Sequence, residues 1–213
     1  MNRHLRSHAA LLATCLLASG CSTLIGGPRE TPTIFAPEPA RQTDPAWPAV
    51  DWSLVVAGSG DWWMMDGQRI VVSPVPGELQ VYRGALWARS PSAMVEDAVL
   101  RTLEDSGKLR VAAHAGSGIV GDYRLLLEIR TFKADYAGAT TPAAMVEVNA
   151  TLLRVRDQTV AGSRTFRQSV PAAGTEVARV ADAFGAALGS IGHDIAGWTL
   201  QTGQAHQRQA HGP

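Results

Sequence analysis

Few residues of this chain have the type and spacing that catalysis or cofactor binding requires. The sequence contains neither a G-x-S-x-G nucleophile motif nor an H-E-x-x-H zinc motif. Residues 116–121 (GSGIVG) match the G-x-G-x-x-G pattern, but a strand-like segment follows them, whereas a dinucleotide site needs them to open a helix. We therefore interpret this segment as a loop, and we expect no catalytic residue, no cofactor and no metal site.

Cys21 is the one residue for which the sequence predicts covalent chemistry. Arg3 and Arg6 precede an apolar run over residues 9–18, which is typical of a secretory signal and too short to span a bilayer. The segment 17–21 (LASGC) that follows looks like a bacterial lipobox. In this interpretation the signal is removed, and Cys21 becomes the mature N-terminus and carries acyl chains such as palmitate. Two or more acyl chains give a stable membrane anchor, whereas one chain binds reversibly.

An ordinary secretory signal that happens to contain a cysteine is the alternative. A free thiol at the N-terminus of an exported protein would face an oxidising compartment, and acylation removes it. Ser22 stands after the cysteine where an aspartate would retain a lipoprotein at the inner membrane. The resemblance to lipoproteins therefore implies an anchor in the outer membrane, on its periplasmic face.

The composition argues against several other functions. Lys and Arg together number 19, as do Asp and Glu. Two of the basic residues lie in the signal, so the mature chain is nearly neutral and offers no electrostatic basis for binding nucleic acid. Removal of the signal leaves Cys21 as the only cysteine, which excludes an intramolecular disulfide and a cysteine-ligated metal.

The chain is expected to divide into four segments. Residues 1–20 form the signal peptide, and residues 21–49 carry the lipidated cysteine and a proline-rich tether that cannot bury enough apolar surface to fold. Residues 50–200 form one domain, whose length suits a single hydrophobic core. The polar residues 201–213 are expected to be a disordered tail.

The domain shows the patterns of strands and two helices. Apolar residues alternate over 123–134 and 146–152, which predicts two long strands, and residues 159–170 are expected to return antiparallel. Shorter strands are expected over 51–57, 69–73, 78–82 and 109–113.

Two helices complete the predicted domain. Ser90 and Pro91 are typical of a helix start, and Gly107 of a helix end. Residues 177–198 have apolar side chains at spacings of three and four, which predicts an amphipathic helix. A mostly antiparallel sheet with both helices on one face, an α+β fold, is the expected architecture.

Two local features call for an explanation. Gly185 and Gly189 in the last helix are expected to allow close packing on the sheet, despite a cost of about 1 kcal/mol for each glycine in a helix. Trp62 and Trp63 would point to opposite faces of a strand, so that one of them could contact a partner. Packing of both indoles in the core and at its rim is the alternative.

Residues 69–198 contain a series of short motifs in a characteristic order. They are RI at 69–70, PGEL at 76–79, Tyr82, LWA at 86–88, Pro91, LEDSG at 103–107, DYRL at 122–125, RTF at 164–166 and DIAGW at 194–198. Each motif alone is weak. In this order, and behind a lipobox, they resemble the ABC-type transport auxiliary lipoproteins, the family that includes the paraquat-inducible protein C type.

This resemblance implies both a fold and a role. The implied fold is similar to the N-terminal domain of the translocation protein TolB, and the family supplies no catalytic residues. The implied partners are an MCE-domain periplasmic protein and an inner-membrane ABC transporter that moves lipids. The implied role is to dock the MCE component at the outer membrane.

The main alternative is a lipid-binding carrier module that holds the transported lipid itself. Such a module would need an apolar cavity on the order of hundreds of Å³. The sequence also leaves open whether the protein forms a homo-oligomer, which lipid is moved and in which direction.

Overall fold

The computed structural model describes residues 31–58 and 67–210. The chain divides into two units, Met1–Thr31 and Pro32–Pro213, and the second unit contains every element described below. Cys21, Trp62 and Trp63 lie outside the described residues. Their predicted roles as lipidation site and partner contact therefore stay predictions.

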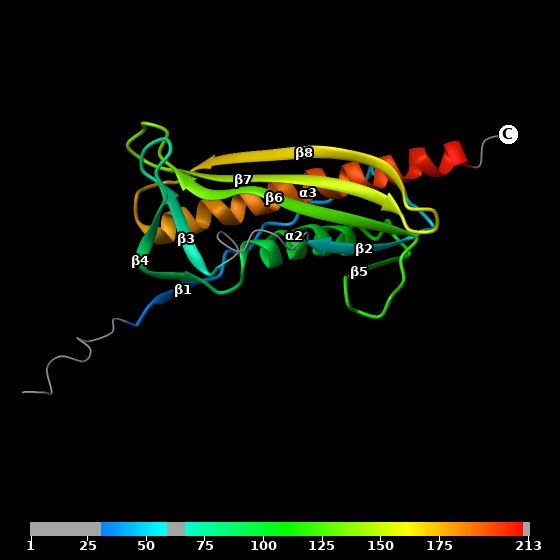
Figure 1. The fold of residues 1–213 in the computed structure, drawn as a ribbon, viewed down its shortest axis with the longest axis horizontal. Helices are drawn as coiled ribbons and strands as arrows, with labels where there is room; N and C mark the ends of the chain where they lie inside the picture. Colours follow the sequence, from blue (N-terminus) through cyan, green and yellow to red (C-terminus); the bar gives the residue numbers. More distant parts are fainter. Residues whose placement is uncertain (1–30, 59–66, 211–213) are drawn as a thin grey trace, which may run out of the picture. The chain divides into compact units, whose positions relative to one another are not determined.

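The described part of the second unit contains one eight-stranded sheet and two helices (Figure 1). In chain order the elements are β1 (Thr33–Phe35), β2 (Ser53–Gly58), β3 (Arg69–Ser73), β4 (Gln80–Trp87), α2 (Pro91–Ser106), β5 (Val111–His114), β6 (Tyr123–Asp135), β7 (Ala143–Arg154), β8 (Thr159–Pro171) and α3 (Val177–Ala210).

β6 is the central strand because it is long enough to pair with three neighbours. Along one edge it pairs antiparallel with β7, and β8 continues the sheet beyond β7. Along the other edge its first residues pair parallel with β2 and its last residues pair parallel with β3. β5 extends the sheet beyond β2, whereas β4 and then β1 extend it beyond β3. The sheet therefore forks into two branches on this side of β6.

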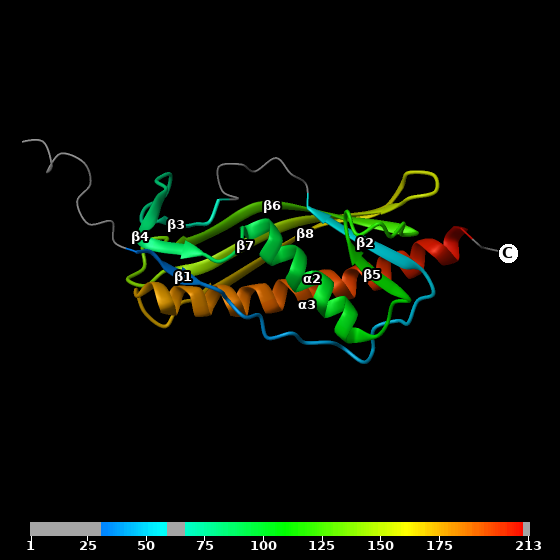
Figure 2. The same cartoon turned by 90° about the horizontal axis from the view of Figure 1, so that it is seen from below.

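Both helices pack on the same face of the sheet (Figure 2), which confirms the α+β class. The long β6–β7–β8 meander is antiparallel, as the sequence predicts. The rest of the sheet is more mixed than expected, because β1, β2, β3 and β5 each have a parallel neighbour. Alternating apolar residues reveal a strand but do not reveal the direction of the strand beside it.

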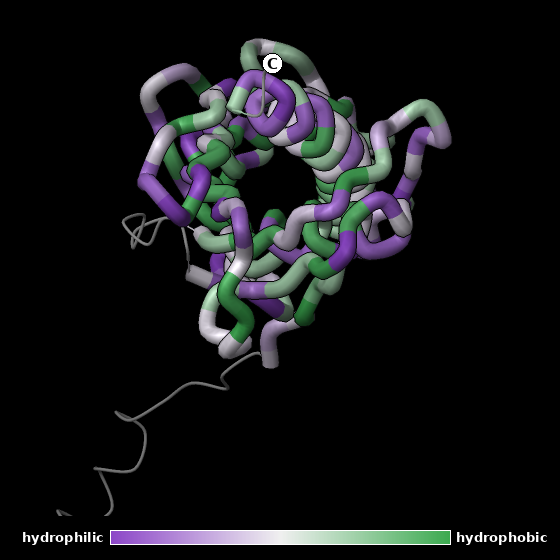
Figure 3. Tube along the Cα trace, turned by 90° about the vertical axis from the view of Figure 1, so that its right-hand side faces the viewer, coloured by the Kyte–Doolittle hydropathy of each residue, from purple (hydrophilic) through white to green (hydrophobic). Residues whose placement is uncertain are grey.

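An aromatic cluster holds α3 against the sheet. Phe184 of α3 stacks on Phe132 of β6 with ring centroids 4.6 Å apart, and it meets Trp87 of β4 edge-on at 5.2 Å. All three side chains are buried. Viewed end-on, the sheet and the helices surround one interior (Figure 3). Burial of a large apolar side chain such as Phe132 or Phe184 contributes about 1.5–3 kcal/mol to stability.

α2 begins and ends at the capping residues that the sequence indicates. The Ser90 hydroxyl accepts a hydrogen bond from the Ala93 amide at 3.4 Å, and Pro91 occupies the first turn. At the other end Gly107 has a φ of 60°, a left-handed conformation that glycine adopts without strain. Its amide donates to the Glu104 carbonyl at 3.1 Å, which closes the helix.

Residues 36–50, called the strap below, lie along the helices (Figure 2). The strap backbone approaches α3 so closely that a Cβ atom at Gly189 would stand 2.6 Å from the Ala40 carbonyl oxygen. A Cβ atom at Gly185 would stand 3.3 Å from the Glu38 carbonyl oxygen. The close packing expected at these two glycines is therefore made with the strap and not with the sheet.

Side chains fasten the strap as well. Trp47 is buried and packs on His193 of α3, with ring centroids 4.9 Å apart. His193 Nδ1 lies 3.0 Å from the Gln42 carbonyl oxygen. The Lys108 ammonium, after α2, donates a hydrogen bond to the Pro45 carbonyl at 3.0 Å. The strap thus contacts α3 and the segment that follows α2.

The domain boundaries consequently differ from the expected ones at both ends. Residues 32–49, which the sequence assigned to the tether, belong to the same unit as the sheet. They are ordered by pairing of β1 with β4 and by the buried Trp47. At the other end α3 continues to Ala210, so that most of the expected tail is helical.

Candidate functional site

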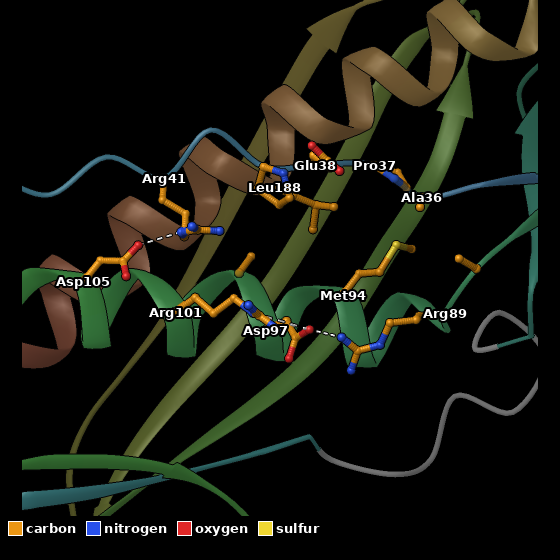
Figure 4. A pocket seen from close by; sticks show the side chains of 13 residues that line it. Ala36, Pro37, Glu38, Arg41, Arg89, Met94, Asp97, Arg101, Asp105 and Leu188 are labelled. Atoms are coloured by element: carbon orange, nitrogen blue, oxygen red, sulfur yellow. Dashed lines mark hydrogen bonds and ion pairs between the residues drawn. The ribbon is translucent and has the colours of Figure 1, made fainter.

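A groove of about 560 Å³ opens between the strap, α2 and α3 (Figure 4). Its lining is partly apolar, with Met94 and Ala98 from α2 and Leu188 from α3. The strap contributes Pro37 and Pro39 to the opposite wall. Met94 and Ala98 lie one turn apart on α2, so both face the groove. The strap lies close to α3 because the glycines of α3 leave room for its backbone.

Charged side chains pair along this groove. Arg89 and Arg101 both form ion pairs with Asp97 of α2, the second of them with Nε at 3.9 Å from Oδ2. Arg41 of the strap pairs with Asp105 of α2, with 2.6 Å between Nε and Oδ2 (Figure 4). The Arg41 pair joins the two walls of the groove. Because both of its side chains are well exposed, we assign it a small contribution to stability.

His114 of β5 approaches the same cluster. Its Nε2 lies 3.1 Å from Asp97 Oδ1, and its Nδ1 lies 3.7 Å from Glu96 Oε2. The Asp97 carboxylate, which is mostly shielded from solvent, therefore sits among two guanidinium groups and an imidazole. This arrangement ties the first half of α2 to β5 and to the segment before the helix.

The described lining of the groove contains no serine, threonine, cysteine or histidine, so it supplies no hydroxyl or thiol nucleophile and no imidazole base. Of its three acidic side chains, Asp97 and Asp105 are paired with arginines, and the third is Glu38 of the strap. Methionine and arginine, which both line this groove, are enriched at protein interfaces.

A second concave region, of about 540 Å³, lies where Trp52, Arg110, Tyr123 and Arg154 come together. Two of its polar side chains bind residues next to the region, whereas the buried Trp52 Nε1 has no hydrogen-bond partner among the described residues. Arg154 forms two hydrogen bonds with the Asp157 carboxylate, at 2.9 and 2.6 Å. The Tyr123 hydroxyl lies 3.0 Å from Nδ1 of His206, on α3. We interpret this region as a structural end cap of the domain.

The structure also places the motifs that the sequence singled out. Residues 116–121 lie in the loop between β5 and β6, as predicted, so the G-x-G-x-x-G pattern has no helix to open. In the described ranges, no cluster of His, Cys, Asp and Glu is arranged to hold a metal. Neither α2 nor α3 is long and apolar enough to cross a membrane.

The sequence did not predict the groove. Its walls come from the strap and from two helices that are far apart in the chain. The one available signal is the spacing of Asp97, Arg101 and Asp105, which recur every four residues and so share one face of α2. That spacing alone is also typical of an ordinary solvated helix face.

Comparisons with known proteins agree with this fold. Residues 33–196 match the family of ABC-type transport auxiliary lipoprotein components. A crystal structure of a Xanthomonas campestris protein with the family designation DUF330 is 45% identical, with a TM-score of 0.77 over 83% of this chain and 99% of that one. A crystal structure of an uncharacterized protein has the same fold at 14% identity and a TM-score of 0.54, covering 75% of this chain and 97% of that one. No curated protein matches the sequence.

Proposed function

This chain belongs to the family of ABC-type transport auxiliary lipoprotein components, and on that premise we propose its specific role. We propose that it is the outer-membrane auxiliary of an MCE-type ABC lipid-transport system. In this role it faces the periplasm, is anchored through acylated Cys21, and docks the periplasmic MCE component at the outer membrane. The family is a transport auxiliary component and not a class of enzymes.

The observation that carries the proposal is the family match together with the LASGC segment at residues 17–21. The match begins at residue 33, where β1 begins, so it includes the strap. The anchor and the family domain are therefore separated by only about a dozen residues. A protein held this close to a membrane is suited to fixing a partner there.

The groove supports docking as the mode of action. It combines an apolar wall with charged groups, and its described lining contains no hydroxyl or thiol nucleophile. A segment of the MCE component could contact Met94 and Leu188 while exchanging ion pairs with Arg101 and Asp105. Trp62 and Trp63 are the second proposed contact, because tryptophan is enriched at the energetic centres of interfaces.

Co-purification from cross-linked membranes tests this function. The wild-type protein is expected to recover an MCE-domain protein and the subunits of an ABC transporter. Arg101→Glu, which reverses one charge in the groove, and the double variant Trp62→Glu/Trp63→Glu are each expected to reduce this recovery severalfold. Val160→Glu, at an exposed position of β8, is the matched control and should recover the partner normally.

Two results would contradict docking. If the wild-type protein recovers no transporter component, the proposed partnership is wrong. Stoichiometric extraction of phospholipid by the delipidated protein would replace docking with the lipid-carrier alternative.

A further inference from the structure

We propose that the β3–β4 hairpin contacts the bilayer that holds the anchor. The contact is made by four exposed apolar side chains on this branch of the sheet, Ile34, Val75, Leu79 and Val81, together called the hairpin surface below. This inference rests on the proposed acylation of Cys21. The four side chains are 65%, 51%, 53% and 43% exposed. The other large apolar side chains that the structure leaves exposed lie on β5, the loop after it and the start of β8, at the opposite end of the unit (Figure 1).

The register of the strands explains why the hairpin surface is not covered by the core. Val72 is buried, so Val71 beside it on β3 points away from the core, and Val81, its partner on β4, points the same way. On β1, Phe35 packs against the core, so its neighbour Ile34 also points outward. Residues on three adjacent strands thus present apolar side chains to the exterior.

The hairpin tip is held in a fixed conformation. Pro74 and Pro76 flank Val75 and restrict the backbone. The Val75 carbonyl accepts hydrogen bonds from the Glu78 amide at 3.1 Å and from the Ser73 hydroxyl at 3.2 Å. Little conformational entropy is therefore lost when the tip meets another surface.

β1, the first strand after the proposed anchor in the sequence, lies at the same end of the unit as the hairpin (Figure 1). β1 runs parallel to β4, with Thr33 opposite Ala85, and β4 begins at the hairpin tip with Gln80. Ala85 lies five residues along β4 from Gln80, and β4 is irregular between them, because its register with β3 shifts there. The chain from Cys21 to Thr33 spans at most about 40 Å. With Cys21 acylated as proposed, the bilayer lies within this distance of Thr33, and the hairpin lies at the same end of the unit as β1 (Figure 1).

Charged neighbours set the depth of the contact. Glu78 at the tip is exposed and accepts a hydrogen bond from the Gln80 side chain at 2.5 Å. An ionised carboxylate is costly in the hydrocarbon core. Arg69 and Arg83 are exposed on the same branch, and a guanidinium group binds phosphate well. The hairpin surface is therefore suited to the headgroup level of the bilayer and not to its centre.

A fluorescence experiment on the lipidated protein tests the contact. Removal of the signal and acylation of Cys21 leave no free thiol, so Leu79→Cys or Val75→Cys introduces a single site for an environment-sensitive dye. The labelled protein is reconstituted into vesicles of phosphatidylethanolamine and phosphatidylglycerol, some of them brominated near the headgroup. Val120→Cys, an exposed apolar position at the opposite end, is the matched control.

We expect the dye at positions 75 and 79 to shift to shorter wavelength and to lose at least half of its emission to the brominated lipid, while the dye at 120 shows neither change. Vesicle flotation of the same samples reports on the anchor separately. If the protein floats but the dye at 75 and 79 behaves like the dye at 120, the hairpin contact is excluded and the anchor stands.

If the protein does not float and no quenching occurs with excess vesicles, both the anchor and the contact fail. Dimeric cross-links through position 79 without vesicles, combined with no quenching on vesicles, would assign the surface to a second copy of the chain instead.

Discussion

At the scale of single residues, one carboxylate joins β2 to the start of β6. Asp122 Oδ2 accepts hydrogen bonds from the Ser53 amide at 2.8 Å and from the Ser53 hydroxyl at 2.7 Å, and Arg110 Nη2 lies 3.2 Å away. The Ser53 amide is the largest cause that holds the pKa of Asp122 below its ordinary value. The Ser53 hydroxyl and the Arg110 charge act in the same direction, against the effect of partial burial.

This lowered pKa predicts a pH-dependent contribution to stability. A carboxyl group whose pKa is lower in the folded state than in the unfolded state stabilises the fold at pH values above the unfolded pKa of about 3.9. This contribution is lost as the pH falls through the folded pKa. We expect Asp122→Asn to lower the free energy of unfolding by about 1 kcal/mol at pH 7, a modest value because the side chain is half exposed.

Urea unfolding at pH 7 and below pH 3 measures this contribution. The difference between wild type and Asp122→Asn should shrink at the lower pH. Asp182→Asn, at an exposed aspartate on α3, should cost little at either pH. An equal cost of Asp122→Asn at both pH values would show that packing and not charge is responsible.

At the scale of elements, the sequence predicts the helices and strands whose limits depend on neighbouring residues in the chain. β3 has the predicted bounds, α2 begins and ends at Ser90 and Gly107, and the β6–β7–β8 meander follows its alternation. The strap could not be predicted in this way. Its conformation depends on glycines of α3 that lie more than a hundred residues later in the chain. The groove shares this origin, because the strap forms one of its walls.

The end of α3 was missed for a similar reason. Residues 201–210 are polar and look like a tail in isolation. In the fold, the His206 ring bonds the Tyr123 hydroxyl, and the Gln207 amide donates to Asp51 at 3.2 Å. These contacts stabilise the part of α3 that extends beyond its apolar residues.

Gly189→Ala tests the contact between the strap and α3. Alanine ordinarily stabilises a helix by about 1 kcal/mol relative to glycine. At Gly189, however, the added methyl group would stand 2.6 Å from the Ala40 carbonyl oxygen, so the strap must shift. We expect a net loss of roughly 1–3 kcal/mol in the free energy of unfolding. Ser190→Ala, the exposed neighbour on the same helix, is the control and should be neutral or slightly stabilising.

Amide hydrogen exchange would locate the effect of Gly189→Ala. Faster exchange is expected over residues 36–50, with little change in β6 and β7. A variant more stable than wild type would mean that the strap does not press on α3.

At the scale of the whole molecule, the proposed anchor determines where the domain can act. Cys21→Ala should prevent acylation, because no thiol remains at the predicted cleavage site. The protein is then expected to leave the membrane fraction or to persist as an unprocessed precursor. Cell fractionation and the intact mass of the product measure both outcomes.

Cys15→Ala is the matched control for the anchor, because it removes the other cysteine of the signal region. It should be processed and should fractionate like wild type. The lipoprotein assignment of Cys21 would be abandoned if Cys21→Ala were also processed and retained at the membrane.

The strap has a further consequence for the order in which the protein matures. The Gln42 carbonyl meets His193 across a sequence separation of 151 residues, and the glycines that shape the strap's path lie on the last element of the chain. An exported chain emerges N-terminus first, so the strap lacks its contacts with α3 until that last helix has arrived. Contacts of such long range form late in folding. In the proposed export, the strap therefore leaves the translocation machinery early but completes its packing late, close in sequence to the proposed lipid anchor.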